Sequence, residues 1–341
     1  MVKPLDNGLY VREDLWSLPR WDPTLQWYAL AMGAMFQKPI DDPTSWRFQA
    51  AIHGYDDTLP DLAALKQPDE TLPADQTIYW AQCQHHGWYF LPWHRGYLGY
   101  FERMVRKTII GLGGPATWAL PYWNYASSAP NAMLMRPEFL EPNLPNGTPT
   151  VADGSPNPLF NGIVRGDPNM VDTPFGSAGD FQITPNDVSM QCLTTPYFDD
   201  HTASLSFGGA VTGFNHGEDG IGVEGAVETT PHDNIHSDIG GWMDSFETAA
   251  LDPIFWIHHC NIDRLWSVWS AGQGHTNPTD AAWLQPAGVN FPFRFRDENG
   301  ASQVLNPTAV ADSTTSVFTY KYQDISQPTA PAAAQPQVTQ S

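Results

Sequence analysis

The sequence predicts a mainly α-helical protein with long loops and a few short strands. Apolar segments that begin with an N-cap residue or a proline occur in both halves of the 341-residue chain. Residues 126–228 are instead rich in Pro, Gly, Asn and Asp, which predicts a long loop region. Because 41% of the residues are hydrophobic and only 16% are charged, the composition is sufficient for a large buried core.

Four segments in the first third of the chain carry helix signals: 24–36, 44–53, 75–86, and a stretch from Pro92 to the glycines at 111, 113 and 114. Thr44 or Ser45 is suited to cap the second of these helices. Pro92 is suited to the first turn of the fourth helix, and the glycines that follow are suited to end it.

Helical signals return in two segments of the second half, TPHDNIHSDIGGWM and DPIFWIHHCNIDRLWSVWS. In the first segment Thr230 would cap the helix and Pro231 would start it. In the second segment Asp252 would cap the helix and Pro253 would start it.

The chain is expected to form one domain over residues 1–325, followed by a flexible tail or linker at 326–341 that is rich in Pro, Ala and Gln. The net charge of −21 argues against nucleic acid and anionic membranes as partners, since both attract basic patches. There is no apolar run of about 18 residues and no signal-peptide layout at the start. We therefore expect a soluble protein, either cytoplasmic or a processed secreted form, and no feature indicates an oligomeric state.

Seven histidines of the predicted helices form two groups: His53, His85 and His94, and then His232, His236, His258 and His259. His232 and His236 are four residues apart, so on a helix they share one face, as two metal ligands on one helix must. His259 and Asp263 have the same spacing, which would place a carboxylate near the ligand face, where it could orient an imidazole.

Packing and metal binding are the two explanations for these histidines. A single histidine in an apolar helix is usually a packed core residue. Two groups of histidines in helices of low charge, each beside Trp, Phe and Pro, are harder to explain as packing, because buried imidazoles without partners are costly. Three imidazoles per site suit copper, zinc, iron or nickel, whereas calcium and magnesium prefer acidic ligands. The residues alone predict two all-histidine transition-metal sites.

Two motifs carry a resemblance to a known family. The segment HHGWYFLPWHRGYLGYFER resembles the copper A signature of tyrosinases and polyphenol oxidases, and PHDNIH followed by DPIFWIHHCNIDRLW resembles their copper B signature. The resemblance covers about residues 10–325 and implies a central four-helix bundle that holds a binuclear copper site, with dioxygen as co-substrate. It implies His53, His85 and His94 as ligands of one copper ion, and His232, His236 and His259 as ligands of the other. His258 would then be a neighbour of the site.

Cys83 lies two residues before His85, in the Cys-x-His arrangement that forms a thioether in fungal tyrosinases and molluscan haemocyanins. The resemblance therefore implies a Cys83–His85 crosslink that would rigidify one copper ligand. Residues two apart point to opposite sides of a helix, so this crosslink requires non-helical backbone. The alternative is an ordinary small buried cysteine.

Three further residues acquire roles from the resemblance. Glu228, in a stretch similar to a plant-type E-N-T-P-H-N motif, would hold a water beside copper B and help deprotonate a phenol, or would be an ordinary loop glutamate. Asp233 follows His232, where many efficient monophenol hydroxylases have Asn, which leaves open the balance of monophenol and diphenol activity. Phe246, 13 residues before His259, would lie over copper A and stack on the substrate or restrict its access, or would be a core aromatic.

The resemblance implies a tyrosinase-type copper oxidase that hydroxylates small monophenols at the ortho position and oxidises o-diphenols to o-quinones. Three alternatives remain: a catechol oxidase or o-aminophenol oxidase without monophenol activity, a haemocyanin-like dioxygen carrier, and a zinc hydrolase.

The motif YKY at 320–322 resembles the tyrosine motif that closes the family's catalytic domain, with Arg12 as its expected cation–π partner. The C-terminal cover domain of many relatives does not follow it here, so we expect an open site, which favours an enzyme over a carrier.

Overall fold

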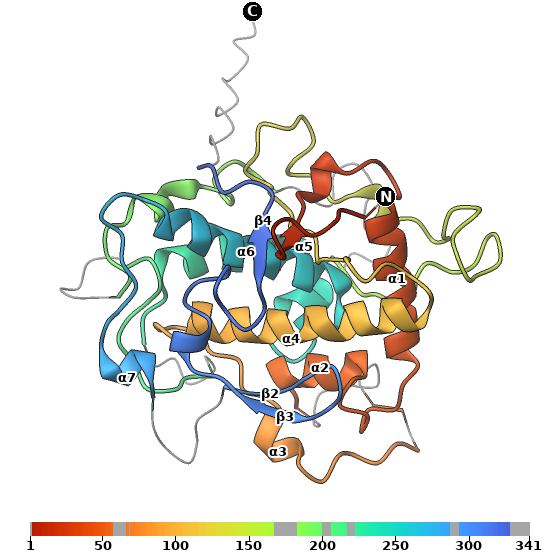
Figure 1. Ribbon diagram of the computed structural model, residues 1–341, viewed down its shortest axis with the longest axis horizontal. Coiled ribbons are helices and arrows are strands. Elements are labelled where there is room, and N and C mark those ends of the chain that lie inside the picture. Colours follow the sequence, from red (N-terminus) through yellow and green to blue (C-terminus); the bar gives the residue numbers. More distant parts are fainter. Residues whose placement is uncertain are drawn as a thin grey trace, which may run out of the picture.

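The computed structural model describes residues 2–56, 66–67, 69–166, 183–199, 206–216, 222–286 and 293–327 of the chain. The fold is mainly helical, as the sequence predicts, with helices α1 (Pro23–Phe36), α2 (Trp46–His53), α3 (Gln76–Tyr79), α4 (Phe90–Gly111), α5 (Asn234–Ile239), α6 (Pro253–Ser270) and α7 (Ala281–Leu284) (Figure 1). Short strands form a parallel pair, β1 (Tyr10–Arg12) with β4 (Tyr320–Tyr322), and an antiparallel pair, β2 (Arg294–Arg296) with β3 (Ser302–Val304). Most of the predicted tail at 326–341 lies outside the described residues.

Helix α4 crosses the middle of the molecule and packs against α1 and α6, while α2 packs against α1 (Figure 1). Up to residue 225, the described parts of the region 126–228 contain only short helical turns, at Pro137–Phe139 and Met190–Thr194, so the predicted long loops are confirmed there. Among the described helices, none combines the length and apolar character needed to cross a membrane.

Helices α2 and α6 begin where the capping signals predict. The side chain of Ser45 accepts a backbone N–H of α2 at 3.0 Å, and the side chain of Asp252 accepts a backbone N–H of α6 at 2.9 Å, with Pro253 in the first turn. Helix α4 begins at Phe90 rather than at Pro92, so Pro92 lies in its first turn, and it ends at the first of the predicted glycines.

The helix predicted over 75–86 is wrong beyond Tyr79, where α3 ends. The backbone N–H groups of residues 81–83 instead donate to the carbonyls of residues 51–53 at the end of α2, at 3.0–3.4 Å. These carbonyls have no partner within their own helix. Pairing with α2 thus replaces a further helical turn and brings residues 81–85 against the end of α2.

The helix start predicted at Thr230 and Pro231 coincides with a kink, where the Thr230 hydroxyl oxygen accepts from the side chain of Asn234 rather than from a backbone N–H. Residues Glu228–Asp233 form a distorted turn in which Thr230 has the non-helical backbone angles φ −146° and ψ 119°, and regular helix α5 begins after this turn. His232 therefore lies before α5, although its ring is still only 4.6 Å from the ring of His236, so the predicted shared face is retained.

A buried ion network joins both ends of the described chain to the two longest helices. We call it the terminal clamp; its members are Arg12 in β1, Arg95 and Glu102 in α4, Asp263 in α6, and Tyr320 and Tyr322 in β4. Arg12 donates to Asp263 at 3.2 Å and to Glu102 at 2.8 Å. Its guanidinium carbon lies 3.6 Å from the ring centroid of Tyr320, so the predicted contact with the tyrosine motif is confirmed.

The prediction that Asp263 orients an imidazole is wrong. Its carboxylate accepts hydrogen bonds from Arg12, Arg95 and both tyrosine hydroxyls of the terminal clamp. Burial raises the pKa of Asp263, but the neighbouring Arg95 and Arg12 outweigh burial and hold that pKa below its usual range. The carboxylate is therefore ionised at neutral pH and acts as the shared counter-charge of two buried arginines.

Replacing Asp263 with Asn should lower the free energy of unfolding by about 3–5 kcal/mol, because two buried guanidinium groups would lose their counter-charge. Since the pKa of Asp263 is lower in the folded state, its contribution should be fully present above the unfolded value of about 4 and lost as the pH falls further. Denaturant unfolding at several pH values measures both effects. As a matched control, Glu13→Gln removes a surface pair with Lys3 and should change stability by less than about 1 kcal/mol. Equal losses in the two variants would contradict the clamp.

Candidate metal centre

Seven histidines from different parts of the chain meet in the interior. They are His53 at the end of α2, His85 in the segment paired with α2, His94 on α4, His232 in the turn before α5, His236 on α5, and His258 and His259 on α6. Apart from His236, which is partly exposed, all of them are at most 4% exposed. Both groups of histidines predicted from the sequence are therefore brought together in space.

The rings within each predicted triplet lie close together. The ring centroids of His53, His85 and His94 are 5.1–5.7 Å apart, and those of His232, His236 and His259 are 4.6–5.4 Å apart. The rings of His94 and His259 stack at 4.6 Å and 14°, which joins the two triplets into one cluster. Within 4.8 Å, possible ligand atoms also group as His53, His94 and His259, and as His232, His236, His258 and His259.

Hydrogen bonds fix the direction of four rings. The Nδ1 atoms of His53, His94 and His236 lie 2.8, 2.8 and 2.6 Å from the backbone carbonyls of Phe246, Phe90 and Met243. Because a carbonyl only accepts, each of these Nδ1 atoms carries the proton and each Nε2 atom carries the lone pair. The Nδ1 atom of His232 lies 2.7 Å from a carboxylate oxygen of Asp233. Fixing the outer nitrogen in this way is typical of metal-binding histidines.

The inner nitrogens have the properties that a transition metal requires. The Nε2 atoms of His53, His94 and His232 are buried and have no hydrogen-bond partner in the described part of the chain. Burial, followed by repulsion between the rings, lowers the pKa of each of these histidines well below 6.5, so the rings are neutral at pH 7. Neutral imidazole nitrogens without partners fit a copper or zinc ion and do not fit calcium or magnesium.

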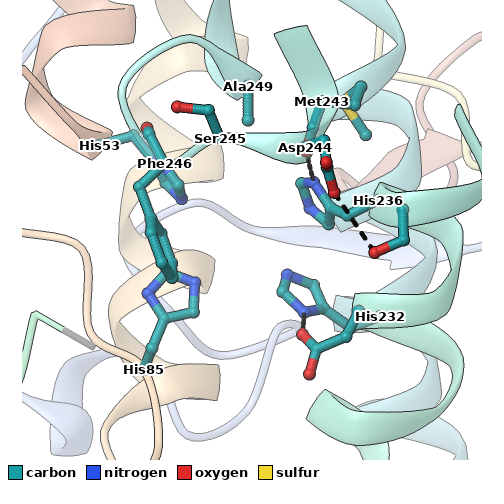
Figure 2. Close-up of a pocket in the computed structure, with 11 residues that line it drawn as sticks. His53, His85, His232, His236, Met243, Asp244, Ser245, Phe246 and Ala249 are labelled. Atoms are coloured by element: carbon teal, nitrogen blue, oxygen red, sulfur yellow. Dashed lines mark hydrogen bonds and ion pairs between the residues drawn. The ribbon is translucent and has the colours of Figure 1, made fainter. Parts of the chain in front are cut away.

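A cavity of about 180 Å³ leads to this cluster. On one side His53, Phe246 and His85 form a wall, and on the other side His236 and His232 face them (Figure 2). The ring of Phe246 is stacked on that of His53 at 6.2 Å and 25°, and it is 4.6 Å from that of His85. The structure thus places Phe246 beside His53 and His85.

The family of the chain follows from a comparison with known protein families. A sequence model described as the common central domain of tyrosinase matches residues 43–272, about two thirds of the chain. The chain belongs to the tyrosinase family. The matched segment includes all seven histidines of the cluster, so the family signature and the site coincide.

Individual relatives agree with this assignment. Tyrosinase HcTyr1 of Hahella sp. (strain CCB-MM4) is 40% identical over 316 residues, which cover 88% of this chain and 61% of that protein. The (+)-larreatricin hydroxylase of Larrea tridentata is 31% identical over 290 residues, which cover 82% of this chain and 44% of that protein. The structure of latent apple tyrosinase superposes with a TM-score of 0.63 at 26% identity over 94% of this chain and 64% of that chain. The chain spans about half of the length of the curated relatives it matches.

Membership of the tyrosinase family narrows the choice of metal. The donor set alone admits copper, zinc, iron or nickel. The family model and the buried cluster of histidine nitrogens together support copper. We therefore describe the cluster as a copper-binding site.

Cys83 lies at the edge of the copper-binding site. Its Sγ atom comes within 4.8 Å of possible ligand atoms of His53 and His85, and it lies 3.2 Å from Nδ1 of His216. The backbone after Tyr79 is not helical, which is the condition that a Cys83–His85 contact requires. Sequence reasoning missed His216, because a single histidine in a loop carries no local signal.

A group of carboxylates lies beside His232. Glu228 is buried; its Oε1 atom accepts the backbone N–H of His86 at 2.8 Å, and its Oε2 atom has no partner among the described residues. Burial raises the pKa of Glu228 well above 4.5 when no metal is present. Glu224, which sequence reasoning missed, lies 3.1 Å from the ring of His86, and burial raises the pKa of both Glu224 and Asp233.

The adjacent pair His258 and His259 offers a direct test of the ligand set. We expect His259→Asn to lose about half of the bound copper and His258→Asn to retain it, because Nε2 of His259 lies 3.2 Å from Nε2 of His236 and its ring stacks on His94. Metal analysis after dialysis against a chelator measures the copper content, and near-ultraviolet circular dichroism checks that each variant is folded. Equal copper loss in both folded variants would show that His259 is not the distinguishing ligand.

Proposed function

We propose that this chain is a polyphenol oxidase of the tyrosinase type, which hydroxylates monophenols at the ortho position and oxidises o-diphenols to o-quinones with dioxygen as co-substrate. The observation that carries the proposal is a set of buried, unpartnered histidine nitrogens that face a cavity lined partly by exposed residues. A haemocyanin-like carrier would use the same nitrogens but would need no opening for a phenol. Exposed Ser237 and Asp244 among the lining residues indicate such an opening.

We assign one copper ion to His53, His85 and His94, and a second to His232, His236 and His259. The resemblance of the two motifs to copper A and copper B signatures supports this division, and the rings within each triplet are close enough to share an ion. When bound, the two ions would supply the redox chemistry that activates dioxygen. His258 remains a packing neighbour, with its ring stacked on that of His232 at 5.5 Å and 27°.

Side chains of the chain itself would bind the phenol and take its proton. Phe246 offers an aromatic wall on which the phenol ring can stack. Glu228 has a buried carboxylate oxygen without a partner in the described residues, and we assign to it the role of accepting the phenol proton through a water. Asp233 holds the ring of His232 through Nδ1, which keeps the Nε2 lone pair directed inward.

One observation favours a second candidate, a catechol oxidase or o-aminophenol oxidase without monophenol activity. Asp233 occupies the position after His232 where many monophenol hydroxylases have Asn, and its carboxylate is already engaged with that histidine at 2.7 Å. A carboxylate engaged in this way has less capacity to help Glu228 hold a water. The balance between the two activities therefore depends on Glu228 and Asp233.

Glu228→Gln should lower kcat/KM for monophenol hydroxylation by about 100-fold, and for the matching diphenol by much less, because proton acceptance is most demanding for the monophenol. Oxygen uptake by the copper-loaded chain, with both substrates in parallel, measures this. Glu13→Gln, a surface carboxylate variant, is the control and should change neither rate. Uptake with the diphenol alone by the unmodified chain would establish the second candidate, and no uptake with either, despite bound copper, would favour the carrier.

We also propose the thioether between Cys83 and His85. The proximity of Sγ to the His85 ring and the non-helical backbone support it. Forming the bond removes one hydrogen from the sulfur and one from an imidazole carbon, and the two electrons and two protons would pass to dioxygen. The crosslink would fix a ring whose Nδ1 atom, unlike that of His53, has no hydrogen-bond partner in the described part of the chain.

The intact mass of the denatured, copper-exposed protein should therefore be lower than the sequence mass by two hydrogen atoms. The Cys83→Ala variant should show its full sequence mass, and a peptide containing the Cys83–His85 link should be found only in the unmodified chain. Cys192→Ala is the matched control, because Cys192 is also buried, and this variant should still lose two hydrogens. A full sequence mass for the unmodified chain after copper and dioxygen exposure would exclude the crosslink.

A further inference from the structure

Among the residues that the structure describes, the rim of the cavity carries acidic side chains and neither Lys nor Arg. The lining residues include Asp233 and Asp244 but neither Lys nor Arg. The carboxylate of Asp233 is 41% exposed, and Asp244 is exposed and accepts a hydrogen bond from the hydroxyl of Ser237 at 3.3 Å. A molecule that enters the cavity thus passes two carboxylates before it reaches the histidines.

The segment of the chain that supplies most of this rim is also negatively charged. Residues 166–263 contain 16 Asp and Glu residues and neither Lys nor Arg. This segment supplies every lining residue except His53 and His85. Within the described part of the cavity wall, the carboxylates therefore face no compensating cation.

The floor of the cavity sets the direction in which a phenol would lie. The buried Nε2 atoms of His53 and His232 have no partner in the described residues, and both side chains line the cavity. The hydroxyl end of a phenol would point toward these nitrogens, with its ring beside Phe246. A substituent on the opposite, para position would then point outward, toward Asp244 and Ser237, which are the exposed lining residues.

We propose that Asp244, with Asp233, selects phenols and catechols that carry a cationic para substituent, such as a primary ammonium, over those that carry a carboxylate. This inference rests on the proposed function, since it names a substrate class for the same site. Opposite charges a few ångströms apart in a partly solvated rim attract one another, and a substrate carboxylate is repelled by the same groups. The selection acts on binding, so it should appear in KM more than in kcat.

Three diphenols that differ in the charge of the para substituent test this proposal: dopamine (cationic), ethylcatechol (neutral) and dihydrocaffeate (anionic). Their use makes the test independent of monophenol activity. Oxygen uptake by the copper-loaded chain should give kcat/KM values in that order, with about a 10-fold to 100-fold ratio between the cation and the anion at low salt. The ratio should fall as the ionic strength rises, because salt screens exposed charges. A ratio of one or below would overturn the proposal.

Two variants assign the selection to the rim. Asp244→Asn should reduce the cation-to-anion ratio several-fold, and Asp244→Lys should reduce it further. Asp41→Asn removes an exposed carboxylate that does not line the cavity, and it should leave the ratio unchanged. Thermal unfolding checks that each variant is folded. An unchanged ratio in folded Asp244→Lys would exclude Asp244 as the selecting residue.

A binding measurement separates this inference from the proposed function. The para-fluorinated forms of phenethylamine and phenylpropanoate have rings without hydroxyl groups, so they can bind without turnover. Fluorine NMR titration of the copper-loaded chain should show tighter binding of the amine, and Asp244→Lys should reverse the preference. If no diphenol supports oxygen uptake but the amine still binds more tightly, the oxidase function fails and the charge selection stands. Equal binding of the two probes would overturn the charge selection itself.

Discussion

The carboxylate of Asp263 lies between two buried arginines, Arg12 and Arg95, that come from distant parts of the chain. Arg95 follows His94 on α4, and Asp263 lies one turn after His259 on α6, so the contact between these helices is fixed next to the histidines that they carry. The stacking of His94 and His259 at 4.6 Å depends on that register. Because burying such charges is costly unless every partner is present, the terminal clamp is more a device for specifying one arrangement than a source of net stability.

The copper-binding site itself opposes folding when no metal is bound. Several of its ring nitrogens are buried without partners in the described part of the chain, and each such group costs about 1–3 kcal/mol. The pairing of residues 81–83 with the end of α2 and the terminal clamp hold the rings in place nonetheless. A metal that binds these nitrogens removes the penalty and stabilises the folded state by mass action. The rigid fold that holds these nitrogens without partners is therefore also what gives the site its affinity for a metal.

Capping residues in the sequence correctly predicted the starts of helices that depend on a nearby side chain. Ser45 and Asp252 cap their helices because a side-chain oxygen and a free N–H lie two or three residues apart in any sequence context. The helix expected to reach residue 86 failed for a non-local reason, since carbonyls of α2 accept the N–H groups that would have continued it. Spacing placed Asp263 near His259, yet its partners Arg12 and Arg95 lie 251 and 168 residues away, beyond the reach of a helical pattern.

In the site as well, residues within local motifs could be predicted from the sequence, and residues outside them could not. The family motifs contain six of the seven histidines, so these six could be named from the motifs, and the structure brings them together with His53. His216, Glu224 and Asp244 lie outside those motifs: His216 and Glu224 come from the long loop region, and Asp244 ends the short helical turn Gly241–Asp244 after α5. What sequence reasoning missed is therefore mostly the surroundings of the metal cluster.

Within the cavity, the residues that would bind the metal lie at the floor, and the charged residues that would recognise the substrate lie at the rim. The floor of the cavity presents imidazole nitrogens, which bind metal and are neutral at pH 7. The full charges among the lining residues belong to Asp233 and Asp244. A phenol therefore meets a charge at the rim and a metal at the floor, separated by the apolar wall that Phe246 provides. A change at Asp244 can alter which phenol binds without altering the ligands that carry out the oxidation, because Asp244 is hydrogen-bonded to Ser237 rather than to a histidine.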